Sequence, residues 1–155
     1  MTVHELDETD LCILRSLQEN SRLTTKELAL KIHLSTTPTF ERQRRLERLG
    51  YIKKYVAVLD GDLLEKGFVV FCSVSMKQIN HEVAAMFSGL LETWDEVTEC
   101  YNTSGDGDYL MKVCVSSMRQ YQQFILDKVG QFEYVSHVRS VFVMDTLKLN
   151  YGVPI

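Results

Sequence analysis

Residues 24–50 have the sequence TTKELALKIHLSTTPTFERQRRLERLG, which predicts two helices around a tight break. Thr24 is a favourable N-cap residue, and apolar side chains recur after it at helical spacing. Ser35 is a second N-cap candidate, and Pro38 lies in the first turn that follows, where its missing N–H costs no helical hydrogen bond. Gly50 is a common helix terminator. The second helix is therefore expected to begin just after Ser35 and to end at Gly50.

The second of these helices has a cationic outward face. At about 100° per residue, Leu46 marks the buried side, whereas Glu41 and Arg44 point away from it. Hydroxyl side chains near a helix N-terminus allow close approach to phosphate, and guanidinium groups bind phosphates or guanine edges. These properties suit a helix that binds in the DNA major groove. The candidate DNA contacts are Ser35, Thr36, Thr37, Arg42, Arg44, Arg45 and Arg48. The alternative is a solvated helix whose charges stabilise it through i,i+3 and i,i+4 pairs.

The preceding segment strengthens the DNA-binding interpretation. Apolar residues between Asp7 and Asn20 fit an amphipathic helix, so that three short helices follow one another. Helix-turn-helix units are built in this way. The strand-like YIKKYVAVLD after Gly50 favours a winged variant.

Length and composition place the chain among soluble globular proteins. It has 155 residues, 45% of them hydrophobic and 25% charged, enough for one domain or two small ones. We expect a cytoplasmic protein, because the sequence shows neither a signal peptide nor an apolar run of about 20 residues. The four cysteines form no CxxC motif, which favours reduced thiols and argues against a metal site. No metal or cofactor is expected.

The net charge of −4 is unevenly distributed. Residues 1–54 hold ten Lys and Arg against eight Asp and Glu, whereas residues 55–155 hold seven against thirteen. The basic part is therefore the N-terminal one. An acidic second part would repel DNA and confine the contact to one end of the chain.

The second part of the chain is predicted to contain two similar strand-helix-strand halves. Turn-forming residues in DGDLLEKG, at 60–67, separate it from the first part. The expected strands are 68–77, 96–103, 109–116 and 134–149, and the expected helices are 80–93 and 118–129. This order describes a ferredoxin-like βαββαβ sandwich. The predicted fold is α+β: a winged helix-turn-helix domain at 1–54, a linking strand and linker at 55–67, and a ferredoxin-like domain at 68–155.

Several of the predicted strands carry apolar residues on both faces. In the first strand, Phe68 and Val70 lie on one face and Val69 and Phe71 on the other. Helices can cover only one face of such a sheet. The simplest cover for the other is a second copy of the same sheet, which predicts a two-fold dimer. A long loop or the C-terminal NYGVPI segment folding over the sheet is the alternative.

Three segments of the chain resemble the Lrp/AsnC (leucine-responsive, feast/famine) family of transcription regulators. They are LDETDLCILRSLQENSRLTTKELA, LSTTPTFERQRRLERLGYI and ECYNTSGDGDYLMKV. The resemblance implies a helix-turn-helix followed by a ferredoxin-like effector domain that dimerises, commonly assembles to octamers, and binds a small molecule, usually an amino acid, between subunits. By position it implies effector contacts from Asn102, Thr103, Ser104, Gly105, Asp106, Gly107, Asp108, Tyr109, Met118, Val141, Phe142 and Val143.

The loop at 103–109 has suitable chemistry for an amino-acid ligand. Glycines let backbone amides approach a carboxylate, and Asp106 or Asp108 can accept from an ammonium group. A tight acidic hairpin without a ligand is the alternative. The chain also departs from the family pattern. Polar Thr39 and Gln43 stand at usually apolar positions, which predicts looser packing of the recognition helix, and Gly107 replaces a larger residue, which predicts a wider pocket.

We therefore expect a sequence-specific, DNA-binding transcriptional regulator. Its partners would be double-stranded DNA, further copies of itself as a dimer or octamer, and a small-molecule effector that we expect to be an amino acid. The alternative is an effector-sensing protein-interaction module with weak or no DNA binding. An enzyme is not expected, because no nucleophile lies beside a base and no phosphate-binding glycine motif occurs.

Overall fold

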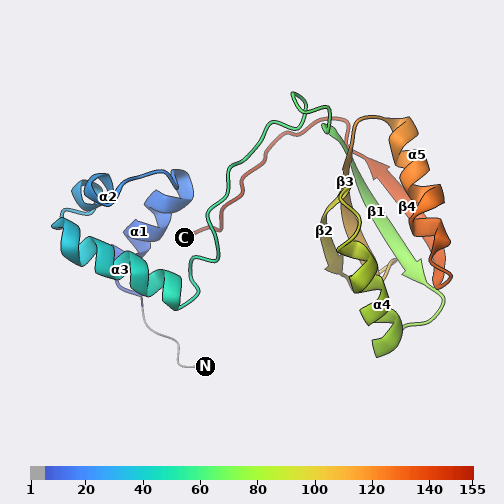
Figure 1. Cartoon of the computed structure of the whole chain (residues 1–155), viewed down its shortest axis with the longest axis horizontal. Helices are drawn as coiled ribbons and strands as arrows, with labels where there is room; N and C mark the ends of the chain where they lie inside the picture. Colours follow the sequence, from blue (N-terminus) through green and yellow to red (C-terminus); the bar gives the residue numbers. More distant parts are fainter. Residues whose placement is uncertain (1–5) are drawn as a thin grey trace. The chain divides into compact units, whose positions relative to one another are not determined.

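The computed structural model describes residues 6–155, so the first five residues of the predicted 1–54 domain lie outside the description. The chain forms two compact units (Figure 1). The first contains the residues up to Val58 together with Lys148–Ile155, and the second contains Leu59–Leu147.

The first unit is built from three helices: α1 (Glu8–Glu19), α2 (Thr25–Lys31) and α3 (Thr36–Arg48). Capping boxes at Asp7 and Thr24 start the first two: the cap side chain accepts from the backbone N–H three residues ahead, and the N–H of the cap residue donates to the side chain of that same residue. Gly50, with φ of +82°, follows α3. Buried side chains from all three helices form the core, namely Ile13, Leu17, Leu28 and Leu46. The predicted three-helix arrangement is confirmed.

The last residues of the chain pack on α1. The Gln18 side chain donates to the carbonyl of Val153 at 2.8 Å and accepts from its N–H at 2.9 Å. Arg15 Nε donates to the carbonyl of Ile155 at 2.9 Å. Residues 148–155 therefore belong with the helical unit, whereas the sequence pattern groups them with the second domain.

The second unit is an antiparallel four-stranded sheet with two helices. Its elements are β1 (Phe68–Met76), α4 (His81–Leu91), β2 (Val97–Asn102), β3 (Tyr109–Val115), α5 (Met118–Asp127), a 3-10 turn (Val129–Gln131) and β4 (Val135–Phe142). The strand order is β2-β3-β1-β4 (Figure 1), as a ferredoxin-like sandwich requires. Asn80 caps α4 as predicted.

Both helices of the second unit cover the same face of the sheet. Val70, Cys72 and Val74 of β1 point into one core with Phe87 of α4 and Phe124 of α5. On β1 and β3 every second residue is buried there. The other face of the sheet carries Phe71, Tyr101 and Val141, which remain exposed.

Two predicted strands differ from the structure. Residues 52–60 have no regular secondary structure, because this segment finds no strand in its own chain with which to form a hydrogen-bonded ladder. The final strand ends at Phe142 rather than near 149, because β1, its partner, begins at Phe68. Among residues 6–155, no helix is both long enough and apolar enough to span a lipid bilayer.

Candidate functional site

The outward face of α3 is the first candidate site. Thr36, Thr37, Phe40, Arg44 and Arg48 are all exposed on it. Ser35, the N-cap residue, forms no side-chain capping bond, so its hydroxyl is available at the start of the helix. The surface combines hydroxyl groups, two guanidinium groups and one aromatic ring. It can therefore bind anionic oxygens and the edges of bases.

Two of the predicted DNA contacts instead hold the helices together. Asp10 on α1 is fully buried and accepts from both Arg42, at 2.9 Å, and Arg45. Arg42 also donates to Asp7 at 2.6 Å. The N–H of Asp10 and the guanidinium of Arg42 lower the pKa of Asp7, and the two aspartates raise the pKa of Arg42. These two arginines therefore join α3 to α1, whereas Arg44 and Arg48 face away.

The polar residues at positions 39 and 43 do not loosen the helix. Thr39 is fully buried, and its hydroxyl donates to the carbonyl of Ser35 at 2.8 Å. Gln43 donates to the hydroxyl of Tyr55 at 3.0 Å, and that hydroxyl donates to Glu47 at 2.9 Å. The predicted looser packing is therefore wrong at Thr39, and Gln43 has polar partners.

The second candidate site is the loop between β2 and β3. The N–H of Thr103 donates to the carbonyl of Asp108, and its hydroxyl donates to the carbonyl of Gly107. Asp108 is bonded to β1, since its N–H donates to the carbonyl of Val74 and its carboxylate accepts from the N–H of Met76 at 2.7 Å. The carboxylate of Asp108 therefore fixes the loop to the sheet.

Asp106 presents the exposed charge of this loop. Its carboxylate pairs with Arg139 of β4 at 3.3 Å, and its carbonyl accepts from the hydroxyl of Ser75. Gly107 is closely packed, because a Cβ there would lie 2.1 Å from the hydroxyl oxygen of Ser73. The wider pocket predicted at Gly107 is not observed, since Ser73 fills that space.

One chain does not bring all the predicted effector residues together. The 102–109 segment lies at the Val74 end of β1, where Tyr109 pairs with Val74, whereas Phe142 pairs with Val70. Met118, Val141 and Val143 belong to that same far end of the sheet. Four residues of strand, about 13 Å, separate Val70 from Val74. The side chain of Phe142 also faces the core, where it packs on Tyr121.

Comparison with known proteins identifies the family. Residues 6–53 match a family model described as a winged helix-turn-helix DNA-binding domain, and residues 69–153 match the Lrp/AsnC ligand binding domain. The chain belongs to the Lrp/AsnC family of DNA-binding transcriptional regulators.

Relatives of known name cover almost the whole chain. The Bkd operon transcriptional regulator of Pseudomonas aeruginosa is 36% identical over 97% of this chain and 99% of its own. The leucine-responsive regulatory protein of Escherichia coli is 34% identical over 93% of this chain and 88% of its own.

Solved structures agree closely with the fold. The transcriptional regulator NMB0573 of Neisseria meningitidis, in complex with L-Met, has a TM-score of 0.93 with 32% identity and covers 97% of both chains. An AsnC family regulator from Agrobacterium tumefaciens has a TM-score of 0.91 with 36% identity and covers 96% of this chain and 97% of its own. The α+β class predicted from the sequence is confirmed.

Within this Lrp/AsnC chain, the uncovered face of the sheet combines apolar and charged groups. Phe71 of β1 and its cross-strand neighbour Val141, on the edge strand β4, are both exposed there. Glu99 and Lys112 form an ion pair at 2.8 Å on the same face, and the Lys112 ammonium and the Tyr101 hydroxyl lower the pKa of Glu99. The face is therefore apolar across β1 and β4 and carries a satisfied ion pair across β2 and β3.

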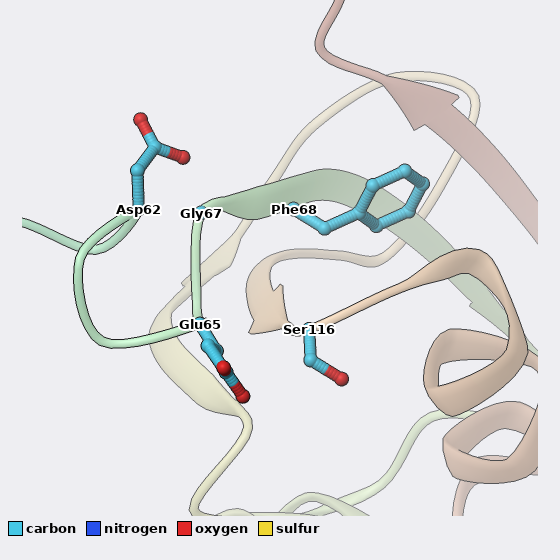
Figure 2. A pocket seen from close by; sticks show the side chains of 5 residues that line it. All are labelled: Asp62, Glu65, Gly67, Phe68 and Ser116. Atoms are coloured by element: carbon cyan, nitrogen blue, oxygen red, sulfur yellow. The ribbon is translucent and has the colours of Figure 1, made fainter.

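Two hollows lie elsewhere on the second unit. Figure 2 shows the first, of about 400 Å³, lined by Asp62, Glu65, Gly67, Phe68 and Ser116. The second, of about 530 Å³, is mainly apolar and includes Met86, Leu90, Trp94 and Phe132 in its lining. Within residues 6–155 no group of three or more His, Cys, Asp or Glu side chains is placed so that it could hold a metal ion.

Proposed function

We propose that this Lrp/AsnC regulator binds the DNA major groove through the outward face of α3, and that an amino acid bound between ligand-binding units changes its assembly or its DNA affinity. The observation that carries the first part is the separation of the α3 arginines. Arg42 and Arg45 are held by Asp10, whereas Arg44 and Arg48 are exposed beside Thr36 and Thr37. The exposed groups are those suited to phosphates and base edges.

A titration of labelled DNA tests the first part. A fragment from upstream of the protein's own gene is titrated at two salt concentrations, with Arg44→Ala as the variant and Arg119→Ala, an exposed arginine of α5, as the matched control. Each lost phosphate contact is expected to reduce the slope of log affinity against log salt by about one. Binding that is indifferent to salt would favour the alternative function, a module without DNA affinity.

The ligand part of the proposal is supported by the chemistry of the β2–β3 loop. An amino acid carries an ammonium and a carboxylate close together. The Asp106 carboxylate and the Arg139 guanidinium, 3.3 Å apart and both exposed, offer the two complementary charges. The structural relative from Neisseria meningitidis is a complex with L-Met, which makes methionine the first ligand to examine.

A thermal-shift screen of the twenty amino acids tests this part. A ligand that binds the folded protein raises its stability, by about 2.7 kcal/mol at a concentration 100 times Kd. We expect at least one amino acid to raise the Tm of the wild type and to lose that effect in Arg139→Gln, but not in Arg119→Gln. No shift with any amino acid would contradict an amino-acid effector.

Self-association is the third element of the proposal. The exposed apolar surface on β1 and β4 is suited to a second copy of itself around a two-fold axis. A dimer would also present two copies of α3 to half-sites about 34 Å apart or a multiple of that distance. Neighbouring subunits would then supply the residues, such as Met118 and Val141, that one chain does not bring to the loop.

A further inference from the structure

An exposed aromatic ring lies in the middle of the DNA-facing surface of α3. Phe40 is the one aromatic residue of this helix, and 44% of it is exposed. It lies one turn after Thr36 and one turn before Arg44, so the three side chains form a stripe along the helix. The sequence pattern shows the position but gives no reason for an apolar residue there.

Phe40 is not part of the hydrophobic core of the first unit. The helix is held to its neighbours by buried Thr39 and Leu46 and by the ion pairs of Arg42 and Arg45. A phenylalanine left in water forgoes the stabilisation that burying its large apolar surface would give. Phe40 therefore presents an apolar surface that the folded unit leaves uncovered.

The guanidinium group of Arg44 lies over the ring of Phe40. The central carbon of its guanidinium lies 5.5 Å from the centroid of the Phe40 ring, within the range of a cation–π contact. The contact orders two long side chains before any ligand arrives, which lowers the cost of binding. The apolar ring of Phe40 and the charged guanidinium group of Arg44 therefore lie next to each other on the helix surface.

We infer that Phe40 contacts the 5-methyl group of a thymine in each half-site, so that this regulator selects a T·A pair there. The inference rests on the proposed binding of DNA by α3. Residues in the N-terminal part of a recognition helix contact base edges, and the thymine methyl is the apolar group that B-DNA exposes in the major groove. The hydroxyl and guanidinium groups around the ring match the polar edges and phosphates on either side.

Removing the methyl group alone tests the inference. A binding site is selected from a random DNA pool with the full-length protein, and each thymine is replaced in turn by deoxyuridine, which keeps the base pair and deletes the methyl. We expect one thymine per half-site at which the replacement weakens wild-type binding about fourfold, as the loss of one buried methyl predicts.

The variants complete a double-mutant cycle. Phe40→Ala is expected to bind the thymine site about tenfold more weakly and to be indifferent to the same replacement, whereas Phe40→Leu keeps part of the dependence. Leu30→Ala, at an exposed leucine of α2, is the matched control and should retain the full methyl dependence. Circular dichroism checks that each variant is folded, as expected for an exposed helical position.

The outcomes separate this inference from the proposed function. Specific, salt-dependent binding with no thymine-methyl dependence, or with equal dependence in Phe40→Ala, would overturn the inference and leave DNA binding intact. Phe40→Ala that binds DNA normally but loses self-association would assign the ring to a protein contact and overturn it as well. A wild type that binds no DNA would overturn the proposed function and the inference together.

Discussion

Asp10 is the residue on which the geometry of the helical unit depends most. It is fully buried, and its carboxylate forms ion pairs with Arg42 and Arg45 of α3. Arg42 also pairs with Asp7. A buried carboxylate is tolerated only when its oxygens are paired. The pairing sets which arginines of α3 lie against α1 and which lie on the outward face of the helix.

We predict that Asp10→Ala destabilises the helical unit by about 3 kcal/mol, because it removes the buried acceptor of Arg45 and one of the two acceptors of Arg42. Glu8→Ala, at an exposed acid of the same helix turn, is the control and should change stability by less than about 0.5 kcal/mol. Urea unfolding followed by far-UV circular dichroism measures the change. Trp94, the single tryptophan, lies in the other unit, so its fluorescence reports that unit separately. Equal stability of the two variants would contradict a structural role for Asp10.

Asp7 makes the stability of this unit depend on pH. The N–H of Asp10 and the Arg42 guanidinium hold the pKa of Asp7 below its usual 3.8. A lowered folded-state pKa contributes stability that is present above pH 3.8 and is lost as the pH falls through the folded-state pKa. Asp7→Asn keeps a capping side chain but removes the charge. The advantage of the wild type over this variant should therefore be constant well above pH 3.8 and shrink as the pH falls below that value, and an advantage independent of pH would contradict the pairing.

The sequence predicts residue roles unevenly on α3. Helical spacing correctly separates Leu46 from Arg44 and Arg48, since spacing alone fixes which face a side chain occupies. It does not show that Arg42 and Arg45 meet Asp10, because that contact joins residues more than 30 positions apart. It also gives no reason for an exposed aromatic ring at Phe40, although the position of this residue between Thr36 and Arg44 is visible in the sequence.

At the scale of elements, local signals predict where most helices and strands begin. Asp7, Thr24 and Asn80 act as caps because their side chains accept nearby backbone N–H groups, a property of the local sequence. The end of β4 and the missing strand at 52–60 depend instead on which partner strands are present. Pairing of that kind is not encoded in a propensity.

The C-terminal segment is held to α1 by hydrogen bonds of two side chains, Arg15 and Gln18. Both hydrogen bonds between Gln18 and Val153 are lost in Gln18→Ala, and each contributes about 1 kcal/mol. We predict that the amide of Val153 then exchanges with solvent at least about fivefold faster, measured by hydrogen exchange with NMR detection. Gln123→Ala, at an exposed glutamine of α5, serves as the control. Unchanged exchange in Gln18→Ala would show that the segment is held by other contacts.

At the scale of the whole molecule, the uncovered face of the sheet predicts self-association. Replacing Phe71 and Val141 by lysine should weaken a dimer more than tenfold, because it removes two apolar surfaces and brings like charges together. Leu126→Lys, on the exposed side of α5, should leave the dimer intact. Sedimentation velocity at micromolar concentration distinguishes the two. A wild type that sediments as a single chain would rule out the paired sheets.

The proposed function gives the α3 arginines two separate roles, stabilisation of the fold for Arg42 and DNA binding for Arg44. Measuring both roles in the same variants tests the account of the whole molecule. The most direct measurement is the salt dependence of DNA affinity for Arg44→Ala and Arg42→Ala, each paired with its unfolding midpoint in urea. We expect Arg44→Ala to lower the salt slope by about one and leave stability nearly unchanged. Arg42→Ala should lower stability and leave the slope of the folded protein nearly unchanged. If Arg44→Ala bound DNA with the wild-type slope, DNA recognition by the outward face of α3 would be contradicted.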